Sequence, residues 1–249
     1  MQPIAREAGY LRTAFGLLST LPVGRTATWQ AGDSGRSAHW YPLVGLVIGG
    51  LTWLAWRAAL IWFPAPVAGV LSLLVWVALS GGLHLDGLAD CCDGLFASAT
   101  PERRLEIMKD PRLGTFGGLG LLLVLLLKAA ALSSLLPSAG WGILLAAVLS
   151  RWCILPAALL PLARLGGMGA DFSGGLRRTS IVIGAWLPLG LLIVLGWPGI
   201  AATLAAWLAG AGVVWLAKTR LNGVTGDIFG MLVEVTETVV LLVFTIGVK

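Results

Sequence analysis

Long apolar segments separated by short polar connectors make up most of this chain. Segments of membrane-spanning length lie at 43–63, 66–83, 116–137, 141–161, 181–197, 198–217 and 229–248. Because a spanning α-helix needs about 20 predominantly apolar residues, this pattern predicts an all-α, polytopic helical membrane protein with about six to seven transmembrane helices. The last segment is the weakest, since Glu234 and Glu237 lie in its first half.

The composition agrees with this fold class and argues against an ordinary soluble domain. Hydrophobic residues make up 57% of the 249 residues, and only 12% are charged. A soluble domain carries about 25% charged residues. We find no internal repeat, so we expect a single integral-membrane domain over residues 1–249.

The basic residues are distributed in a way that predicts the orientation of the chain in the membrane. Thirteen of the 17 Lys and Arg residues lie within 1–42, 84–115, 162–180 and 218–228, and the alternate connectors contain none. Positively charged loops stay on the cytoplasmic side. The N-terminus and these polar connectors are therefore expected in the cytoplasm, where they would form the active site. The same count explains the net charge of +5 without nucleic-acid binding.

The segment 82–94 contains a regular row of carboxylates. Asp86, Asp90 and Asp93 are spaced i, i+4 and i+7, which places them within about 60° of one helical face. Like charges on one face repel each other, and a hard divalent cation with oxygen ligands, typically Mg²⁺, would offset that repulsion. The alternative is an amphipathic helix with a solvated acidic face. His84 either contacts a substrate or is a hydrogen-bonded structural histidine.

A second acidic set follows the sequence Asn222-Gly-Val-Thr225-Gly. Asp227 and Glu234 are seven residues apart and share a helical face, with Glu237 about 60° around it. Ionisable residues within a span are costly and indicate function. We expect Glu234 and Glu237 to face the same cavity as the first row, whereas Asp227 is either part of that site or a helix cap.

Basic residues near both sets suggest a phosphate site. Lys109, Arg112 and the backbone N–H groups of the Gly-rich turn around Thr115 could bind phosphate, or the two basic side chains are only topological anchors. Lys128 and Arg151 lie within apolar segments. They either bind substrate or neutralise Glu234 and Glu237.

Three motifs together resemble the cobalamin synthase family (adenosylcobinamide-GDP ribazoletransferase). They are HLDGLADCCDG at 84–94, EIMKDPRLGTFG at 106–117, and GVTGDIFG at 223–230 followed by two Glu. The early FGLLSTLPV at 15–23 also fits the N-terminal pattern of this family. The resemblance covers essentially the whole chain, in order.

The resemblance implies a Mg²⁺-dependent phosphotransferase in the bacterial inner membrane that catalyses the last assembly step of adenosylcobalamin. Adenosylcobinamide-GDP would be joined to α-ribazole, or to α-ribazole 5′-phosphate, with release of GMP. A ribose hydroxyl of α-ribazole would attack the phosphate attached to cobinamide. Apart from these substrates and the lipid bilayer, a homo-oligomer and association with other cobalamin-assembly enzymes are left open.

On this interpretation Asp86, Asp90, Asp93 and Asp227 ligate Mg²⁺, and Asp93 is preferred as the proton acceptor by analogy with CDP-alcohol phosphotransferases. The expected substrate-binding residues are His84, Lys109, Arg112, Thr115, Arg151, Asn222, Thr225, Asp227, Glu234 and Glu237.

Two other functions are considered. A CDP-alcohol phosphatidyltransferase-like enzyme would release CMP, but Asp90 stands where the pattern of that family has Arg. A secondary transporter would use Glu234, Glu237, Lys128 and Arg151 as an intramembrane relay. The transporter hypothesis leaves the row of Asp residues unexplained.

Overall fold

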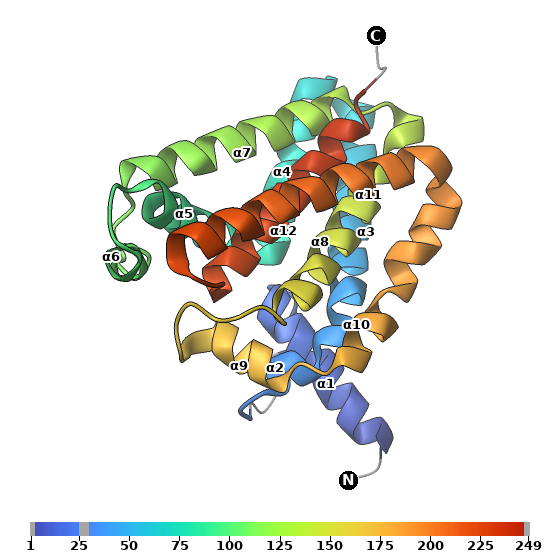
Figure 1. Cartoon of the computed structure of the whole chain (residues 1–249). Helices are drawn as coiled ribbons and strands as arrows, with labels where there is room; N and C mark the ends of the chain where they lie inside the picture. Colours follow the sequence, from blue (N-terminus) through green and yellow to red (C-terminus); the bar gives the residue numbers. More distant parts are fainter. Residues whose placement is uncertain (1–2, 25–29, 247–249) are drawn as a thin grey trace.

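The computed structural model describes residues 3–24 and 30–246. Arg25 and Lys249, which entered the charge count, lie outside them. All regular elements of the described residues are helices (Figure 1). In order they are α1 (Pro3–Leu18), η1 (Pro22–Gly24), α2 (Asp33–Arg36), η2 (Ala38–Trp40), α3 (Tyr41–Trp62), α4 (Ala65–Ser80), α5 (Leu83–Phe96), α6 (Pro101–Ile107), α7 (Thr115–Ser134), η3 (Pro137–Ala139), α8 (Gly142–Ala157), α9 (Gly167–Gly175), α10 (Arg178–Gly184), α11 (Trp186–Leu221) and α12 (Gly226–Val243).

The predicted all-α membrane architecture is confirmed, with fewer separate spanning helices than the seven apolar segments suggested. Within the described residues, four helical stretches are long and apolar enough to span a bilayer. They are Ala38–Trp62, Thr115–Ser134, Pro137–Ala157 and Arg178–Leu221. A fifth is added if α4 and α5, which meet at 92°, form one broken span. The segment 229–248 is not among them.

The segments 181–197 and 198–217 belong to one bent helix. Within α11, Gly196 has φ 57° and ψ −139°, outside the helical region. Pro198 follows and cannot donate a backbone hydrogen bond within the helix. The two apolar segments therefore meet at a sharp kink within α11, and Figure 1 shows the two arms of α11 running in different directions.

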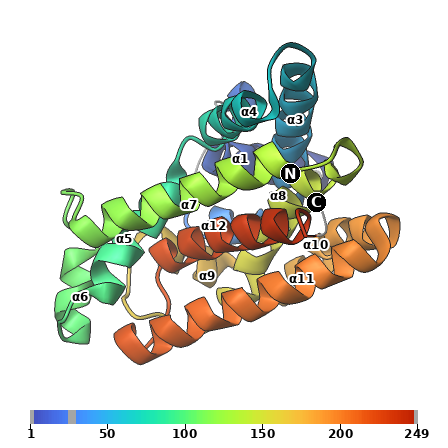
Figure 2. The same cartoon turned by 90° about the horizontal axis from the view of Figure 1, so that it is seen from above.

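Helix α12 lies in the centre of the molecule. Figure 2 shows it between α7 and α11, and it also packs against α5 and α8. It crosses α5 at two glycines: a Cβ on Gly230 would lie 3.2 Å from the Cα of Gly87. Small residues allow helix backbones to approach this closely in membrane proteins. The crossing brings the start of α12 beside the carboxylate row of α5.

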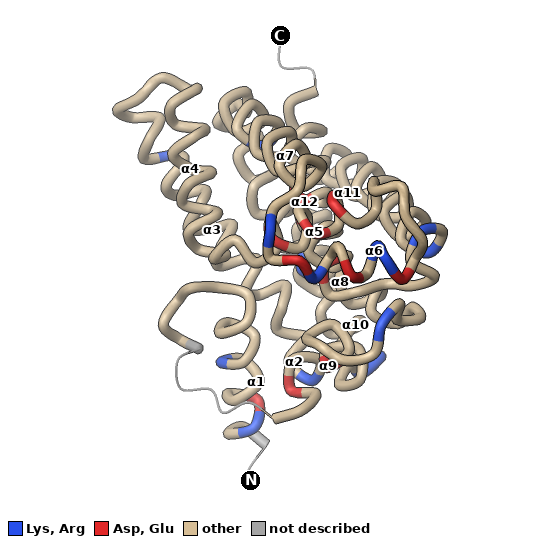
Figure 3. Tube along the Cα trace, turned by 90° about the vertical axis from the view of Figure 1, so that its left-hand side faces the viewer, with Lys and Arg blue, Asp and Glu red and all other residues tan. Residues whose placement is uncertain are grey.

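Most of the described charged residues lie in loops, in short helices or near helix ends, whereas Arg57, Lys128, Arg151, Glu234 and Glu237 lie within long helices. Figure 3 shows Asp, Glu, Lys and Arg around α5, α6, α9 and α1, whereas the long helices are largely uncharged.

Candidate active site

One cavity brings the two acidic sets together, and we call it the carboxylate cavity. Its volume is about 490 Å³, within the usual range for ligand sites. It is lined by Asp86, Ala89, Asp90, Met108, Lys109, Asp110, Pro111, Arg112, Leu113, Arg164 and Asp227. Asp86 and Asp90 therefore meet Asp227, as the sequence predicts.

The turn between α4 and α5 sets the direction of the carboxylate row. Gly81 and Gly82 both have positive φ, 67° and 72°, a conformation that glycine adopts without steric cost. Helix α5 then starts at Leu83 and places Asp86 in its first turn, where a negative charge is stabilised by the helix dipole. Asp90 follows one turn later, on the same face.

Asp227 is held by two donors. Its Oδ2 accepts hydrogen bonds from Arg164 Nη2 at 3.0 Å and from Thr225 Oγ1 at 3.2 Å. Thr225 Oγ1 also accepts from the N–H of Ile228 at 3.3 Å and so caps α12. Thr225, expected to bind substrate, orders the start of α12 and orients Asp227.

Arg164 is a site residue that the sequence did not reveal. Its only signal was its place in a basic connector. The connector is tied to the start of α12, because Ala163 N–H donates to Val224 O and Val224 N–H donates to Pro161 O, each at 2.9 Å. These two bonds bring Arg164 to Asp227.

Asp93 has a different role from the other two members of its row. Its two carboxylate oxygens accept hydrogen bonds at 2.8 Å from the N–H groups of Gly114 and Gly117, at the start of α7. A carboxylate is stabilised there by the unpaired N–H groups and the helix dipole. Asp93 lines a neighbouring cavity of about 430 Å³ with Arg103, Glu106 and Arg112, among others. The structure therefore does not place Asp93 with Asp86, Asp90 and Asp227.

This finding also changes the expectation of phosphate binding at the Gly-rich turn. The N–H groups of Gly114 and Gly117 are already occupied by Asp93. Thr115 is exposed at the first position of α7 and is not among the residues that line the carboxylate cavity. Asn222, also expected to bind substrate, is exposed and ends α11 with φ 61°, a left-handed conformation that Asn tolerates.

Lys109 and Arg112 line the carboxylate cavity together with the carboxylates. Arg112 donates to Asp110 through Nε at 2.9 Å and Nη2 at 2.6 Å. These side-chain bonds, and the Arg112 backbone N–H, lower the pKa of Asp110 to about 2. Among the described residues Lys109 has no ion-pair partner, whereas Arg112 is already paired with Asp110.

Glu234 and Glu237 form a buried network with Lys128 and Arg151 rather than facing the carboxylate cavity. Lys128 Nζ lies 2.5 Å from Glu234 and also pairs with Glu237, which pairs with Arg151 as well. All four residues are buried. Of the two roles left open for Lys128 and Arg151, the structure supports neutralisation.

The prediction of a shared cavity was wrong because α12 extends away from the site. Glu234 is seven residues beyond Asp227, about 10 Å along the helix axis. At that level α12 is enclosed by α7 and α8, which supply Lys128 and Arg151. The three carboxylates share a helical face but meet different neighbours.

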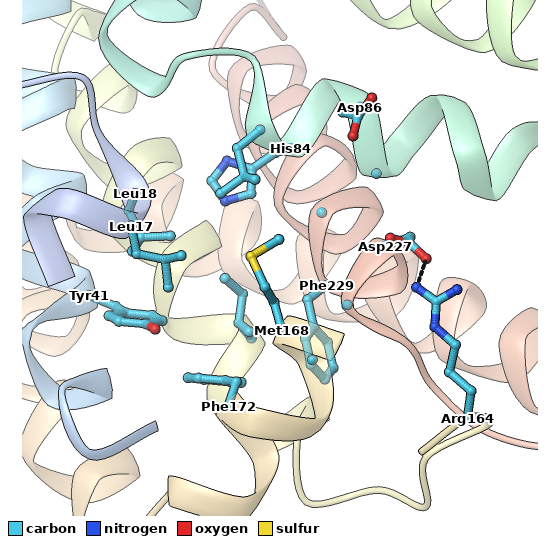
Figure 4. A pocket seen from close by; sticks show the side chains of 16 residues that line it. Leu17, Leu18, Tyr41, His84, Asp86, Arg164, Met168, Phe172, Asp227 and Phe229 are labelled. Carbon is cyan, nitrogen blue, oxygen red and sulfur yellow. Dashed lines mark hydrogen bonds and ion pairs between the residues drawn. The ribbon is translucent and has the colours of Figure 1, made fainter. Parts of the chain in front are cut away.

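A second cavity adjoins the first, and we call it the aromatic cavity (Figure 4). Its volume is about 150 Å³. It is lined by Leu17, Leu18, Tyr41, Leu83, His84, Asp86, Gly87, Ile154, Arg164, Met168, Gly169, Phe172, Gly226, Asp227, Phe229 and Gly230. Asp86, Arg164 and Asp227 line both cavities, so the two meet at these side chains.

The donor set of the carboxylate cavity suits a hard cation, although its side chains do not converge. Among the described residues no three His, Cys, Asp or Glu side chains are close enough to hold a metal ion together. Mg²⁺, however, commonly binds through one or two carboxylates, with water and substrate phosphate completing its shell. Asp90 and Asp227 each place a carboxylate in the lining of the same cavity, so they fit that requirement.

Comparison with known proteins assigns the family. The family described as Cobalamin-5-phosphate synthase matches residues 10–245. Adenosylcobinamide-GDP ribazoletransferase of Desulfitobacterium hafniense (strain Y51) is 39% identical over 92% of this chain and 93% of its own length. Enzymes with the same name from Ectopseudomonas mendocina (strain ymp) and Escherichia coli (strain K12 / DH10B) are 41% and 38% identical, over 95% and 90% of this chain and 98% and 94% of theirs. No solved structure matches the chain. This chain is a membrane-embedded transferase that belongs to the cobalamin-5-phosphate synthase family.

Proposed function

We propose that this protein joins adenosylcobinamide-GDP to α-ribazole, or to α-ribazole 5′-phosphate, and releases GMP. The observation that carries the proposal is the carboxylate cavity, which Asp86, Asp90 and Asp227 line together with Lys109. That combination suits a metal-assisted phosphoryl transfer. The names of the relatives supply the two substrates.

The bonds exchanged in this reaction are few. A ribose hydroxyl oxygen of α-ribazole bonds to the phosphorus attached to cobinamide, and the bond from that phosphorus to the oxygen of GMP breaks. GMP leaves with the electron pair, and the hydroxyl proton passes to a base. Mg²⁺ held by Asp90 and Asp227 would neutralise charge on the phosphates and orient their oxygens.

Asp86 is the best-placed residue to accept the hydroxyl proton. It lines both cavities, so it can reach a nucleophile that enters from one cavity and a phosphate bound in the other. This assignment replaces the earlier preference for Asp93, whose two oxygens already accept backbone hydrogen bonds. Lys109 in the lining of the carboxylate cavity would stabilise the charge that develops on GMP.

We place the protein in the bacterial inner membrane with both cavities open to the cytoplasm. Lys109, Arg112 and Arg164, which surround the carboxylate cavity, come from connectors that are rich in basic residues, and such connectors remain on the cytoplasmic side. Nucleotide substrates are supplied from that compartment.

The test is a transfer assay on the purified protein in detergent. Adenosylcobinamide-GDP, α-ribazole and Mg²⁺ are supplied, and GMP and the joined product are measured. We expect Asp90→Asn and Asp227→Asn to lower kcat roughly a hundredfold or more, whereas Glu102→Gln, on exposed α6, leaves it unchanged. Chelation should stop the reaction, and Mg²⁺ should restore it.

Three results would contradict the proposal. They are the absence of GMP release from the wild-type protein, near-normal turnover of both Asp variants, and release of CMP from a CDP-alcohol instead. Uptake of a solute into sealed vesicles without GMP release would favour a transporter.

A further inference from the structure

The aromatic cavity has an unusual lining for a site that adjoins a cluster of charges. Tyr41, Phe172 and Phe229 are almost fully buried and form one continuous aromatic set. The rings of Tyr41 and Phe172 stack with centroids 5.3 Å apart and an interplanar angle of 12°. Phe172 meets Phe229 edge to face at 5.8 Å. Such surfaces favour a flat aromatic partner.

The polar end of the tyrosine is already used. Tyr41 Oη donates a hydrogen bond to Ser34 O at 2.9 Å. Only its ring is therefore available to an occupant, and Leu17, Leu18 and Met168 add apolar surface (Figure 4). A cavity of about 150 Å³ is large enough to accept a benzene ring. A bicyclic base would extend its second ring towards the adjoining carboxylate cavity.

Apart from Tyr41, whose hydroxyl is already bonded, and the three charged residues at the junction with the carboxylate cavity, His84 supplies the one polar side chain of this lining. Its side chain is only 4% exposed, and Nδ1 is buried without a hydrogen-bond partner among the described residues. A neutral imidazole has one N–H donor and one acceptor nitrogen. A buried polar atom without a partner points to a ligand or an ordered water.

We propose that the aromatic cavity is the subsite for the planar base of α-ribazole, with His84 hydrogen-bonded to the free ring nitrogen of that base. This inference rests on the proposed function and names which part of which substrate the cavity takes. The base of α-ribazole is a bicyclic, largely apolar benzimidazole. In this position its ribose would lie at the junction of the two cavities, where Asp86 meets Arg164 and Asp227.

The lining also explains why the other substrate does not compete for this position. A guanine base has several donors and acceptors along its edges, and each would lose its hydrogen bonds to water in an aromatic cavity. The corrinoid ring system is far larger than a cavity of 150 Å³. A benzimidazole, by contrast, needs only one polar partner, so the cavity distinguishes the nucleophile from the phosphate donor.

The first test fills the cavity from its exposed edge. Met168 lines the cavity but is 66% exposed, so Met168→Trp can occupy the space without disturbing the buried core. We expect a rise of about tenfold or more in KM for α-ribazole, with KM for adenosylcobinamide-GDP unchanged. Phe96→Leu is the matched control, because Phe96 is a half-exposed aromatic residue outside the lining.

The second test measures binding without turnover. α-Ribazole alone is titrated into the purified protein by calorimetry. His84→Ala should raise its Kd by roughly tenfold, the usual effect of one lost hydrogen bond. His84→Asn, which keeps a donor and an acceptor, should recover part of the affinity.

The two measurements separate this inference from the proposed function. Wild-type transfer activity, combined with unchanged KM and Kd for α-ribazole in Met168→Trp and His84→Ala, would overturn the subsite and leave the function standing. An effect of Met168→Trp on adenosylcobinamide-GDP alone would also overturn it. Tight α-ribazole binding that both variants weaken would support the subsite even if the assay detected no transfer.

Discussion

Arg164 Nη2 lies 3.0 Å from Asp227 Oδ2, and this ion pair stands where the carboxylate and aromatic cavities meet. Both side chains are about one-fifth to one-quarter exposed, so the pair is accessible to substrate. Arg164 thereby orients a carboxylate that we propose to bind the metal, and it would add positive charge beside the substrate phosphates.

Replacing Arg164 should weaken catalysis without unfolding the protein. We expect Arg164→Ala to lower kcat/KM by roughly tenfold to a hundredfold, because a hydrogen bond to a charged group contributes about 1.5–3 kcal/mol. Arg164→Lys should recover part of the loss, since it keeps the charge but not the planar geometry. Arg178→Ala, at an exposed basic residue of the same connector, is the control. Wild-type kinetics for Arg164→Ala would refute this role.

Asp93 provides a test of structural against catalytic function. Because its carboxylate accepts from two N–H groups at the start of α7, we expect Asp93→Ala to lower the free energy of unfolding by about 0.5–2 kcal/mol, as for other lost helix caps. Asp93→Asn keeps one acceptor oxygen and should retain most activity. Thermal unfolding and kcat are measured together. A stable but inactive Asp93→Asn would instead support the proton acceptor first expected at this position.

The buried ion network predicts that the stability of the protein depends strongly on the balance of charges among Lys128, Arg151, Glu234 and Glu237. Lys128→Met removes a charge that faces both Glu234 and Glu237 and leaves an uncompensated carboxylate in the apolar interior. Breaking a buried pair in this way costs about 3–5 kcal/mol. The double variant Lys128→Met/Glu234→Gln keeps the pair of Arg151 with Glu237 and should be clearly more stable than the single variant. Unfolding of both is compared in detergent, and equal destabilisation would argue against the charge explanation.

The glycine crossing of α5 and α12 should not accept larger side chains. A Cβ on Gly87 would lie 3.0 Å from Asp227 O and 3.3 Å from the Cα of Gly230. Gly87→Ala therefore has to separate the helices, and overpacking of this kind costs about 1–3 kcal/mol. Activity should also fall, because Asp86 and Asp227 move apart. Gly50→Ala on α3 is the control, since nothing lies within 4 Å of its Cβ. The prediction fails if both variants behave alike.

The sequence predicted the features that depend on local spacing. Asp86 and Asp90 lie one helical turn apart, and that spacing places both on one cavity. Asp227 joins them through the crossing of α5 and α12, which the spacing does not show. The helical class and most spans follow from the apolar segments, because the bilayer fixes their length. The number of spans was harder to predict. The backbone conformation of the single residue Gly196 determines how sharply the segments 181–197 and 198–217 bend relative to each other within α11.

The remaining features depend on partners that are distant along the chain. Hydrogen bonds from two backbone N–H groups, 21 and 24 residues later in the chain, hold Asp93 away from the carboxylate cavity. Glu237 is held by its ion pair with Arg151 on another helix. Neither contact can be predicted from the spacing of the carboxylates along the sequence. Phe172 and Tyr41 were missed for the same reason: aromatic residues in apolar segments are common, and only the tertiary structure stacks these two rings beside the site.

The buried network also fixes the rotation of α12 about its own axis. A turn of one residue, about 100°, would carry Glu234 and Glu237 away from Lys128 and Arg151 and expose four charges to apolar neighbours. Asp227 and Phe229 lie on the same helix. The directions in which their side chains point around the helix axis are therefore set by the ion pairs of Glu234 and Glu237, about two turns or more farther along. The alignment of Asp227 with the aromatic wall is thus determined by a buried ion network outside both cavities.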